Sequence, residues 1–225
     1  MRSQAILFDF GGTLDADGLT WGPRYHAAYR SAGGSLDYSS FDPLHRRSDE
    51  ALARVAGIRS FGFRQTVDAQ VRLLLELVPD QDGVDADRMA DLFHREARAT
   101  VERNRALLER LTGRYRLGIV SNFTGNLAPC LQELGLAHLF AAVGDSGVVG
   151  AAKPDPRIFL EVLGTLGVSA GRAWMVGDNF DADIRGAAGL GMRTCWLAPP
   201  HRAAPPGDLP TARIRHLPEL EGVIG

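Results

Sequence analysis

Side chains that can do chemistry follow short apolar runs at three separate points of this 225-residue chain. Asp9, the pair Ser121-Asn122 and Asp178 each come directly after such a run. Short apolar runs that end in small or polar residues predict buried strands of a parallel sheet. Ligands of such sheets bind beyond the carboxyl ends of the strands. We therefore expect these four residues to meet in one site.

Lysine occurs once in this sequence, at position 153. The chain has 25 lysine and arginine residues together, and every other one is arginine. A compact ammonium fits between a carboxylate and an anionic substrate, where the wider planar guanidinium of arginine fits poorly. Lys153 is thus a candidate for neutralising charge beside Asp9. The alternative is that a single lysine falls there by chance.

The elements that must position these residues alternate along the sequence. Apolar runs predict strands at 5–10, 116–120, 173–176 and 193–197, and helices are expected at 127–134, 156–166 and 182–190. From about residue 99 onward, strand and helix alternate, which predicts an α/β fold with a doubly wound parallel sheet and a Rossmann-like core.

A different pattern fills the segment after the first strand. Amphipathic runs at 44–55, 66–78 and 86–98 have no convincing strand between them, and they predict helices. We therefore expect a core made of residues 1–16 and 99–225, with residues 17–98 inserted as a helical domain.

Composition limits the kind of partner. The chain is 45% hydrophobic and 23% charged, with a formal net charge of -2, so it carries no basic footprint for nucleic acid or an anionic membrane. A small-molecule partner is expected. Its two cysteines form no metal or disulfide pattern, and no targeting signal or membrane span is visible, which favours the cytoplasm. The sequence does not determine the oligomeric state.

Four segments carry a family resemblance. Residues 8–14 (Phe-Asp-Phe-Gly-Gly-Thr-Leu), 119–122 (Ile-Val-Ser-Asn), 153–159 (beginning Lys-Pro-Asp-Pro) and 176–183 (beginning Val-Gly-Asp) resemble, in order, the four motifs of the haloacid dehalogenase-like hydrolases. The resemblance implies a Rossmann-like core, with the segment 17–98 as a small helical cap.

The resemblance also implies roles for individual residues. Asp9 would be the covalent nucleophile, with Lys153, Ser121 and Asn122 completing the catalytic set. Mg²⁺ would be held by Asp9, the backbone carbonyl of Gly11 and Asp178, with Asp183 as a ligand through water or a support. Thr13, Ser121, Asn122 and Lys153 would bind substrate. Hard cations prefer such oxygen ligands, and a carboxylate nucleophile divides one hard step into two.

Gly11 departs from the pattern of the family's phosphatases. They usually carry a second aspartate there, which protonates the leaving oxygen and activates water; such help is typically worth about 10²–10⁴ in rate. Asp15 or Asp17 could substitute, although each is more simply a turn or hinge residue. Restoring the carboxylate with Gly11→Asp is expected to speed hydrolysis of alkyl phosphates most.

Several nearby residues have simpler interpretations. Asp181 is expected to be a surface or capping acid, and Asn179 a helix cap. Trp21 and Tyr25 could shape a pocket or fill the core of the inserted domain. His45, His94, His138, His201 and His216 show no metal spacing, and no role is assigned to them.

The sequence thus predicts a magnesium-dependent hydrolase. The leading hypothesis is a phosphate-monoester phosphatase that acts on a small metabolite through a phospho-aspartate intermediate. A C–halogen hydrolase is the second hypothesis, because the family's dehalogenases also lack the second aspartate. The third is a non-catalytic relative that binds a ligand or partner.

Overall fold

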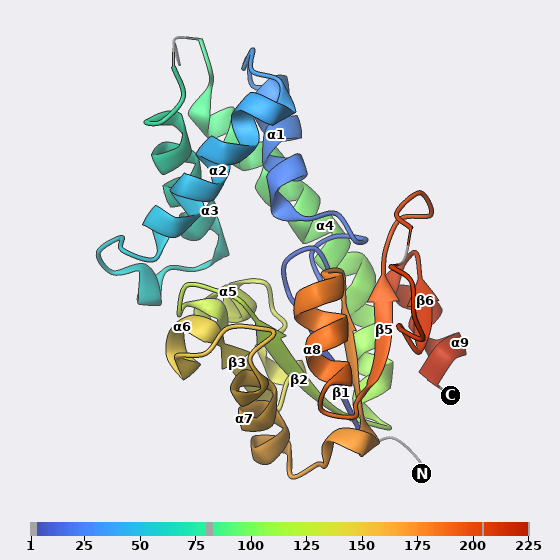
Figure 1. Cartoon of the computed structure of the whole chain (residues 1–225). Coiled ribbons are helices and arrows are strands. Elements are labelled where there is room, and N and C mark those ends of the chain that lie inside the picture. Colours follow the sequence, from blue (N-terminus) through green and yellow to red (C-terminus); the bar gives the residue numbers. More distant parts are fainter. Residues whose placement is uncertain (1–3, 80–82, 204, 225) are drawn as a thin grey trace.

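Six parallel strands form the centre of the molecule (Figure 1). The structure is a computed structural model that describes residues 4–79, 83–203 and 205–224. The strands are β1 (Ala5–Phe8), β2 (Arg116–Ser121), β3 (Ala142–Asp145), β4 (Ala173–Gly177), β5 (Arg193–Leu197) and β6 (Ala212–Ile214), in the order β3-β2-β1-β4-β5-β6. This arrangement confirms the predicted doubly wound α/β fold.

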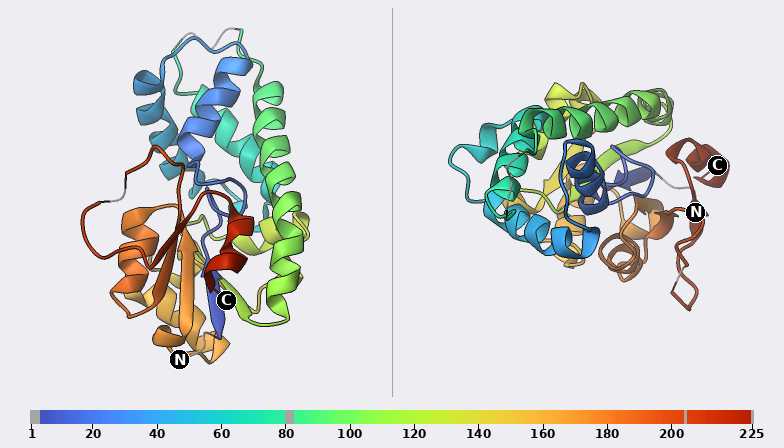
Figure 2. Two further views of the ribbon diagram at one scale, coloured as in Figure 1. Left: turned by 90° about the vertical axis from the view of Figure 1, so that its right-hand side faces the viewer. Right: turned by 90° about the horizontal axis from the view of Figure 1, so that it is seen from above.

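Helices cover both faces of the sheet, as Figure 2 shows from two further sides. Helices α5 (Leu127–Glu133), α6 (Ser146–Val149), α7 (Pro156–Leu166), α8 (Gly186–Ala188) and α9 (Glu221–Ile224) follow the strands. Side chains alternate between the two faces of β1. Ile6 and Phe8 lie in one hydrophobic cluster with α4 and α5, whereas Leu7 lies in a second cluster with α7. Burial on both faces explains the continuous apolar run of this strand.

Four further helices lie together beyond the carboxyl ends of the strands (Figure 1). They are α1 (Trp21–Ser31), α2 (Tyr38–Leu52), α3 (Phe63–Leu75) and the amino-terminal part of α4 (Ala86–Thr112). α1 packs on α2 and α4, and α3 packs on α2 and α4. The helical nature predicted for this segment therefore agrees with the structure.

The predicted boundary between residues 98 and 99 falls inside α4. This helix begins after Asp85, whose side chain accepts a hydrogen bond from the Arg88 amide at 2.9 Å, and it continues unbroken for 27 residues. Phe93 near the start of α4 stacks on Tyr25 of α1. Leu108 near its end belongs to the same hydrophobic cluster, which also includes Ile6 of β1. The division into core and inserted domain stays a prediction, and α4 contributes to both regions.

Some local features differ from the expectations. β3 and β6 are short strands that the apolar pattern did not reveal, and the helix expected at 182–190 is a π-helical turn (Phe180–Arg185) followed by α8. Short 3-10 turns span Ile58–Ser60, Ala137–Leu139, Ala170–Arg172 and Leu217–Leu220. Within the described ranges, no helix is long and apolar enough to cross a membrane.

Candidate active site

The first, second and fourth strands bring three predicted site residues together. β1 lies between β2 and β4, and its Phe8 pairs with Ile119 on one side and Val176 on the other. Asp9, Ser121 and Asp178 therefore leave the sheet at the same edge. β1 and β4 also flank the point where the strand order reverses, which is where open α/β sheets bind their ligands.

Asp9 is held by a hydroxyl and an ammonium. Its Oδ1 accepts hydrogen bonds from Ser121 Oγ at 2.9 Å and from Lys153 Nζ at 2.6 Å. Lys153 Nζ also lies 2.6 Å from Asp183 Oδ1. Burial alone would lower the pKa of Lys153, but Asp183 and Asp9 outweigh it and raise that pKa to about 12. Lys153 is therefore a fixed cation between two carboxylates.

Asn122 positions Lys153 through its backbone. The Lys153 amide donates to Asn122 Oδ1 at 2.7 Å, and Asn122 Nδ2 donates to the Lys153 carbonyl at 3.1 Å. Two hydrogen bonds to the backbone of one residue fix where the lysine side chain starts. Asn122 also lines the cavity above the cluster, where it can contact a ligand.

Three buried carboxylates form a candidate metal centre. One oxygen from each of Asp9, Asp178 and Asp183 lies within 4.8 Å of the others. Asp178 Oδ2 is buried and has no hydrogen-bond partner among the described residues. Burial, and then Asp9 and Asp183, raise the pKa of Asp178 well above its usual value; burial raises that of Asp183 to about 6 although Lys153 opposes it. Crowded oxygen ligands of this kind suit a hard divalent cation, which would relieve their repulsion.

Two glycines let these carboxylates approach the backbone. A Cβ at Gly177 would lie 2.2 Å from Asp183 Oδ2, and a Cβ at Gly12 would lie 2.7 Å from Asp178 Oδ2. Gly12 also has a φ of 91°, which side chains rarely adopt. The glycines beside the carboxylates of the candidate metal centre thus have a steric reason to be there.

Thr13 lies beside the candidate metal centre. It is fully buried, and its hydroxyl donates to Asp178 Oδ1 at 3.3 Å. It is absent from the described residues that line the cavity. The turn after β1 directs this side chain toward Asp178, and substrate binding by Thr13 stays a prediction.

The indole of Trp21 covers the backbone where the family pattern would have a second aspartate. A Cβ built on Gly11 would lie 3.1 Å from Trp21 Nε1 and 3.3 Å from Trp21 Cε2. That nitrogen donates to Asp15 Oδ2 at 2.8 Å, and Asp15 also accepts from the Gly12 amide at 2.7 Å and pairs with Arg24 at 2.8 Å. Asp15 is fully buried and engaged by all three partners, so it supports the turn.

The remaining acids and rings take the simpler roles. Asp17 pairs with Arg103 at 2.6 Å, and the exposed Asp181 pairs with Arg185 at 2.6 Å. Asn179 caps the turn after β4 by accepting from the amides of residues 181 and 182. Tyr25 is buried in the helical region, stacked on Phe93 with ring centroids 3.9 Å apart.

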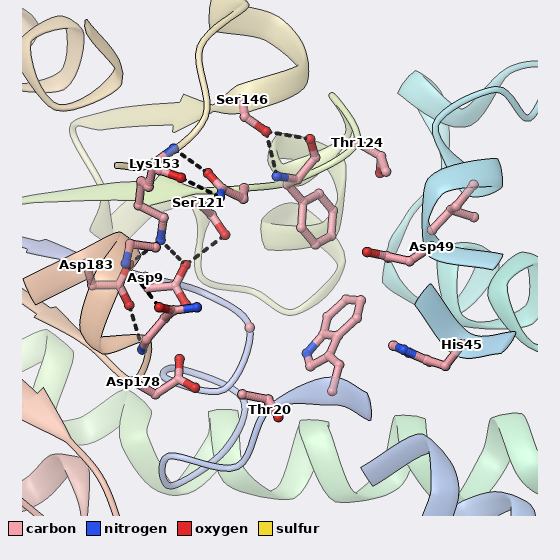
Figure 3. A pocket seen from close by; sticks show the side chains of 17 residues that line it. Asp9, Thr20, His45, Asp49, Ser121, Thr124, Ser146, Lys153, Asp178 and Asp183 are labelled. Carbon is pink, nitrogen blue, oxygen red and sulfur yellow. Dashed lines mark hydrogen bonds and ion pairs between the residues drawn. The ribbon is translucent and has the colours of Figure 1, made fainter. Parts of the chain in front are cut away.

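A cavity of about 320 Å³ opens over this cluster (Figure 3). The core supplies Asp9, Gly11, Ser121, Asn122, Phe123, Thr124, Ser146, Lys153, Asp178, Asn179, Ala182 and Asp183, and the other wall is formed by Thr20, Trp21, His45, Asp49 and Leu52. Sequence reasoning missed His45 and Asp49. Their four-residue spacing predicts that they share one face of a helix, but it does not show whether that face points into the cavity or toward solvent.

Comparisons with known proteins identify the family of this chain. The family profile described as haloacid dehalogenase-like hydrolase matches residues 4–191, which include every residue of the cluster. The chain belongs to the haloacid dehalogenase-like hydrolases. It is accordingly a hydrolytic enzyme.

Individual relatives in this family cover nearly the whole chain. The phosphoserine phosphatase of Thermus thermophilus is 32% identical over 97% of this chain and 90% of its own length. The 5-amino-6-(5-phospho-D-ribitylamino)uracil phosphatase of Escherichia coli is 27% identical over 98% and 92%. The crystal structure of a 2-haloacid dehalogenase from Pseudomonas syringae pv. tomato, 26% identical, covers 99% of this chain and 98% of that chain with a TM-score of 0.58. This haloacid dehalogenase-like hydrolase therefore resembles both phosphatases and a dehalogenase.

Proposed function

We propose that the protein is a magnesium-dependent phosphatase that hydrolyses phosphate monoesters of small metabolites through a phospho-aspartate on Asp9. The observation that carries the proposal is the buried trio Asp9, Asp178 and Asp183, whose oxygens lie within 4.8 Å of one another. Displacement of a halide from carbon does not need a metal cation, whereas attack on a phosphate dianion needs a cation that these carboxylates would hold. Phosphatases are also among the relatives that span nearly the whole chain.

Asp9, Asp178 and Asp183, with the Gly11 carbonyl, are the groups assigned to Mg²⁺. When bound, Mg²⁺ would neutralise charge between the nucleophile and a phosphate dianion. Asp183 and Lys153 remain paired beside it, and Thr13 holds the Asp178 carboxylate through its 3.3 Å hydrogen bond.

In the first chemical step, Asp9 attacks the phosphorus and the bond to the leaving oxygen breaks. Ser121 and Lys153 both donate to Oδ1, which fixes the carboxylate and leaves Oδ2 without a hydrogen bond from the described residues. We assign Oδ2 as the attacking atom. Lys153 then faces the negative charge on the transferring group, an electrostatic role that requires no proton transfer.

The fate of the leaving oxygen follows from Gly11. Without a side-chain acid at this position, the alkoxide takes its proton from water, so esters of acidic alcohols are favoured. In the second step, water attacks the phosphorus of phospho-Asp9, the Asp9–phosphate bond breaks, and inorganic phosphate leaves while water loses a proton to solvent.

A C–halogen hydrolase is the second candidate. It is favoured by Gly11, because the family's dehalogenases lack the second aspartate, and by the similarity to the Pseudomonas syringae enzyme. In that reaction Asp9 would displace halide from carbon, and water would then cleave the resulting ester. In that reaction no metal would need to be held, and Asp178 or Asp183 could instead accept a proton from the water that cleaves the ester.

One pair of assays separates the candidates. Hydrolysis of para-nitrophenyl phosphate is measured with Mg²⁺ and with a chelator, and chloride release from 2-chloropropionate is measured under both conditions. We expect magnesium-dependent phosphate release, abolished in Asp9→Asn, and no chloride release. Chloride release in chelator would establish the dehalogenase instead. A folded protein with neither activity would support a ligand-binding relative.

A further inference from the structure

One side of helix α2 faces the catalytic cluster across the cavity. His45, Asp49 and Leu52 lie four and three residues apart, which places them on one face of the helix. All three line the cavity, and Figure 3 shows the His45 and Asp49 side chains pointing from α2 toward the Asp9 side. We call His45 and Asp49 the α2 pair.

His45 has a polar atom that the described part of the chain leaves without a partner. The residue is 7% exposed, and its Nε2 is buried with no hydrogen bond. Its ring lies among aromatic neighbours, with its centroid 5.2 Å from that of Tyr25 and 6.2 Å from that of Phe41. Burial lowers the pKa of His45 to about 4, so the imidazole is neutral at neutral pH. A buried polar nitrogen needs a hydrogen-bond partner, and at a cavity wall a ligand in the cavity can supply it.

The charges around the cavity are unbalanced. Four carboxylates line it, from Asp9, Asp49, Asp178 and Asp183, while Lys153 is the sole cation among the described lining residues. Lys153 is already paired with Asp9 and Asp183. A divalent ion and the phosphate of a substrate would both lie beside Asp9, Asp178 and Asp183. Asp49, on the opposite wall, would then face the alcohol part of the substrate.

Nearby arginines are bonded to backbone carbonyls. Arg59 donates to the Gly147 carbonyl at 3.4 Å, and Arg202 donates to the Asp178 carbonyl at 3.2 Å. Neither is among the described residues that line the cavity. A carboxylate or second phosphate on the substrate would therefore meet Asp49 without a facing cation, which is unfavourable.

Aromatic rings from both walls also line the cavity. Trp21 and Phe123 both line the cavity and make an edge-to-face contact, with centroids 5.8 Å apart. Apolar surface with two polar groups at one end is the usual composition of a site for a small organic molecule.

We propose that the α2 pair binds the alcohol part of the phosphoester and selects alcohols that carry a hydroxyl or a protonated amine and no further negative charge. This inference rests on the proposed phosphatase function and adds the substrate class. Asp49 accepts from the hydroxyl or ammonium, and His45 supplies the second hydrogen bond.

Three matched substrates test the inference: 2-aminoethyl phosphate, 2-hydroxyethyl phosphate and phosphoglycolate, which differ in the group at the far end. Para-nitrophenyl phosphate serves as the reference for phosphatase activity. At pH 8 with Mg²⁺, we expect kcat/KM for the amine and the hydroxyl to exceed that for the carboxylate by at least about tenfold, the factor that corresponds to roughly 1.4 kcal/mol. Added salt should reduce the gap between amine and carboxylate.

In Asp49→Asn, kcat/KM for the amine substrate and for the carboxylate substrate should differ by no more than about threefold, because the charge that faces them has been removed. His45→Phe should raise KM for the hydroxyl substrate more than for the aryl reference. Glu50→Gln, on the neighbouring exposed position, is the control and should keep the wild-type order. If Asp49→Asn does not fold, the salt series on the wild-type enzyme decides the question.

The outcomes separate the two proposals. Turnover of the aryl reference with equal rates on the three substrates, or with phosphoglycolate preferred, would overturn the role of the α2 pair and leave the phosphatase intact. Survival of the wild-type order in Asp49→Asn would overturn that role as well. Failure to hydrolyse any phosphoester would refute the phosphatase proposal, and this inference with it.

Discussion

Asp178→Asn should make the metal-free protein more stable while removing its response to magnesium. The ligand oxygens of Asp9, Asp178 and Asp183 lie within 4.8 Å of one another. Two unit charges at that separation repel by about 3.5 kcal/mol at an effective dielectric constant near 20. Lys153 pairs with Asp9 and Asp183 and not with Asp178, so Asp178 carries the least compensated charge.

Asparagine keeps the shape of this side chain and an oxygen for the Thr13 hydrogen bond. We therefore expect Asp178→Asn to raise the free energy of unfolding in chelator by about 2 kcal/mol at pH 7.5, because the substitution removes part of the repulsion. The raised pKa of Asp178 fixes the sign. The folded state disfavours the ionised form, so the gain should be present at neutral pH and disappear as the pH falls into the ordinary carboxyl range.

Urea unfolding with chelator and with Mg²⁺ measures both effects. Wild type should gain about 2.7 kcal/mol when Mg²⁺ is at a hundred times its dissociation constant, and Asp178→Asn should gain none. Asp181→Asn, which removes an exposed carboxylate nearby, should stay within about 0.5 kcal/mol of wild type under both conditions. A less stable Asp178→Asn in chelator, or one that Mg²⁺ still stabilises, would refute the reasoning.

Three further predictions concern other residues of the cavity. Lys153→Arg should lower kcat for an aryl phosphate by about 10²-fold or more with an unchanged circular dichroism spectrum, because the guanidinium cannot occupy the ammonium position between two carboxylates; near-normal kcat would contradict this. The pKa of His45 is about 4 against 6.5 in an unfolded chain, so urea titrations should show the wild type losing about 2 kcal/mol of stability relative to His45→Gln between pH 7.5 and pH 5; a constant difference between the two proteins would contradict this. Gly11→Asp should raise kcat for alkyl phosphates more than for aryl phosphates, by up to about 10²-fold. The gain should appear chiefly when Trp21→Leu makes room for the carboxylate. Equal gains on both substrate types would exclude an acid role.

The sequence indicated which residues the sheet brings together, and it did so for a physical reason. Strands buried on both faces must be apolar throughout, so their ends are visible as the first polar residues, and Asp9, Ser121 and Asp178 stand there. Lys153 was visible through composition. β3 (Ala142–Asp145) was missed although an apolar run at 139–143 leads into it, because that run is divided between the 3-10 turn at Ala137–Leu139 and a strand that contains only two of its residues.

The opposite wall of the cavity could not be predicted in the same way. Which face of α2 points inward depends on its packing against α1 and α3, and periodicity does not report that packing. In the sequence, His45 therefore could not be distinguished from the other histidines. The position of Trp21 over Gly11 is likewise a contact between segments, and it changes what can be expected of restoring an aspartate there.

The continuity of α4 has a consequence for how the molecule melts. At about 1.5 Å per residue its 27 residues span about 40 Å, and a single apolar cluster follows it from Phe93 beside α1 to Leu108 beside the sheet. If α1, α2 and α3 lose their packing, they expose the amino-terminal part of α4. The carboxyl-terminal part of the same helix packs in the cluster that includes the sheet. Heat should therefore disrupt both regions in one cooperative transition, and a cut between residues 98 and 99 should yield two fragments that do not fold alone.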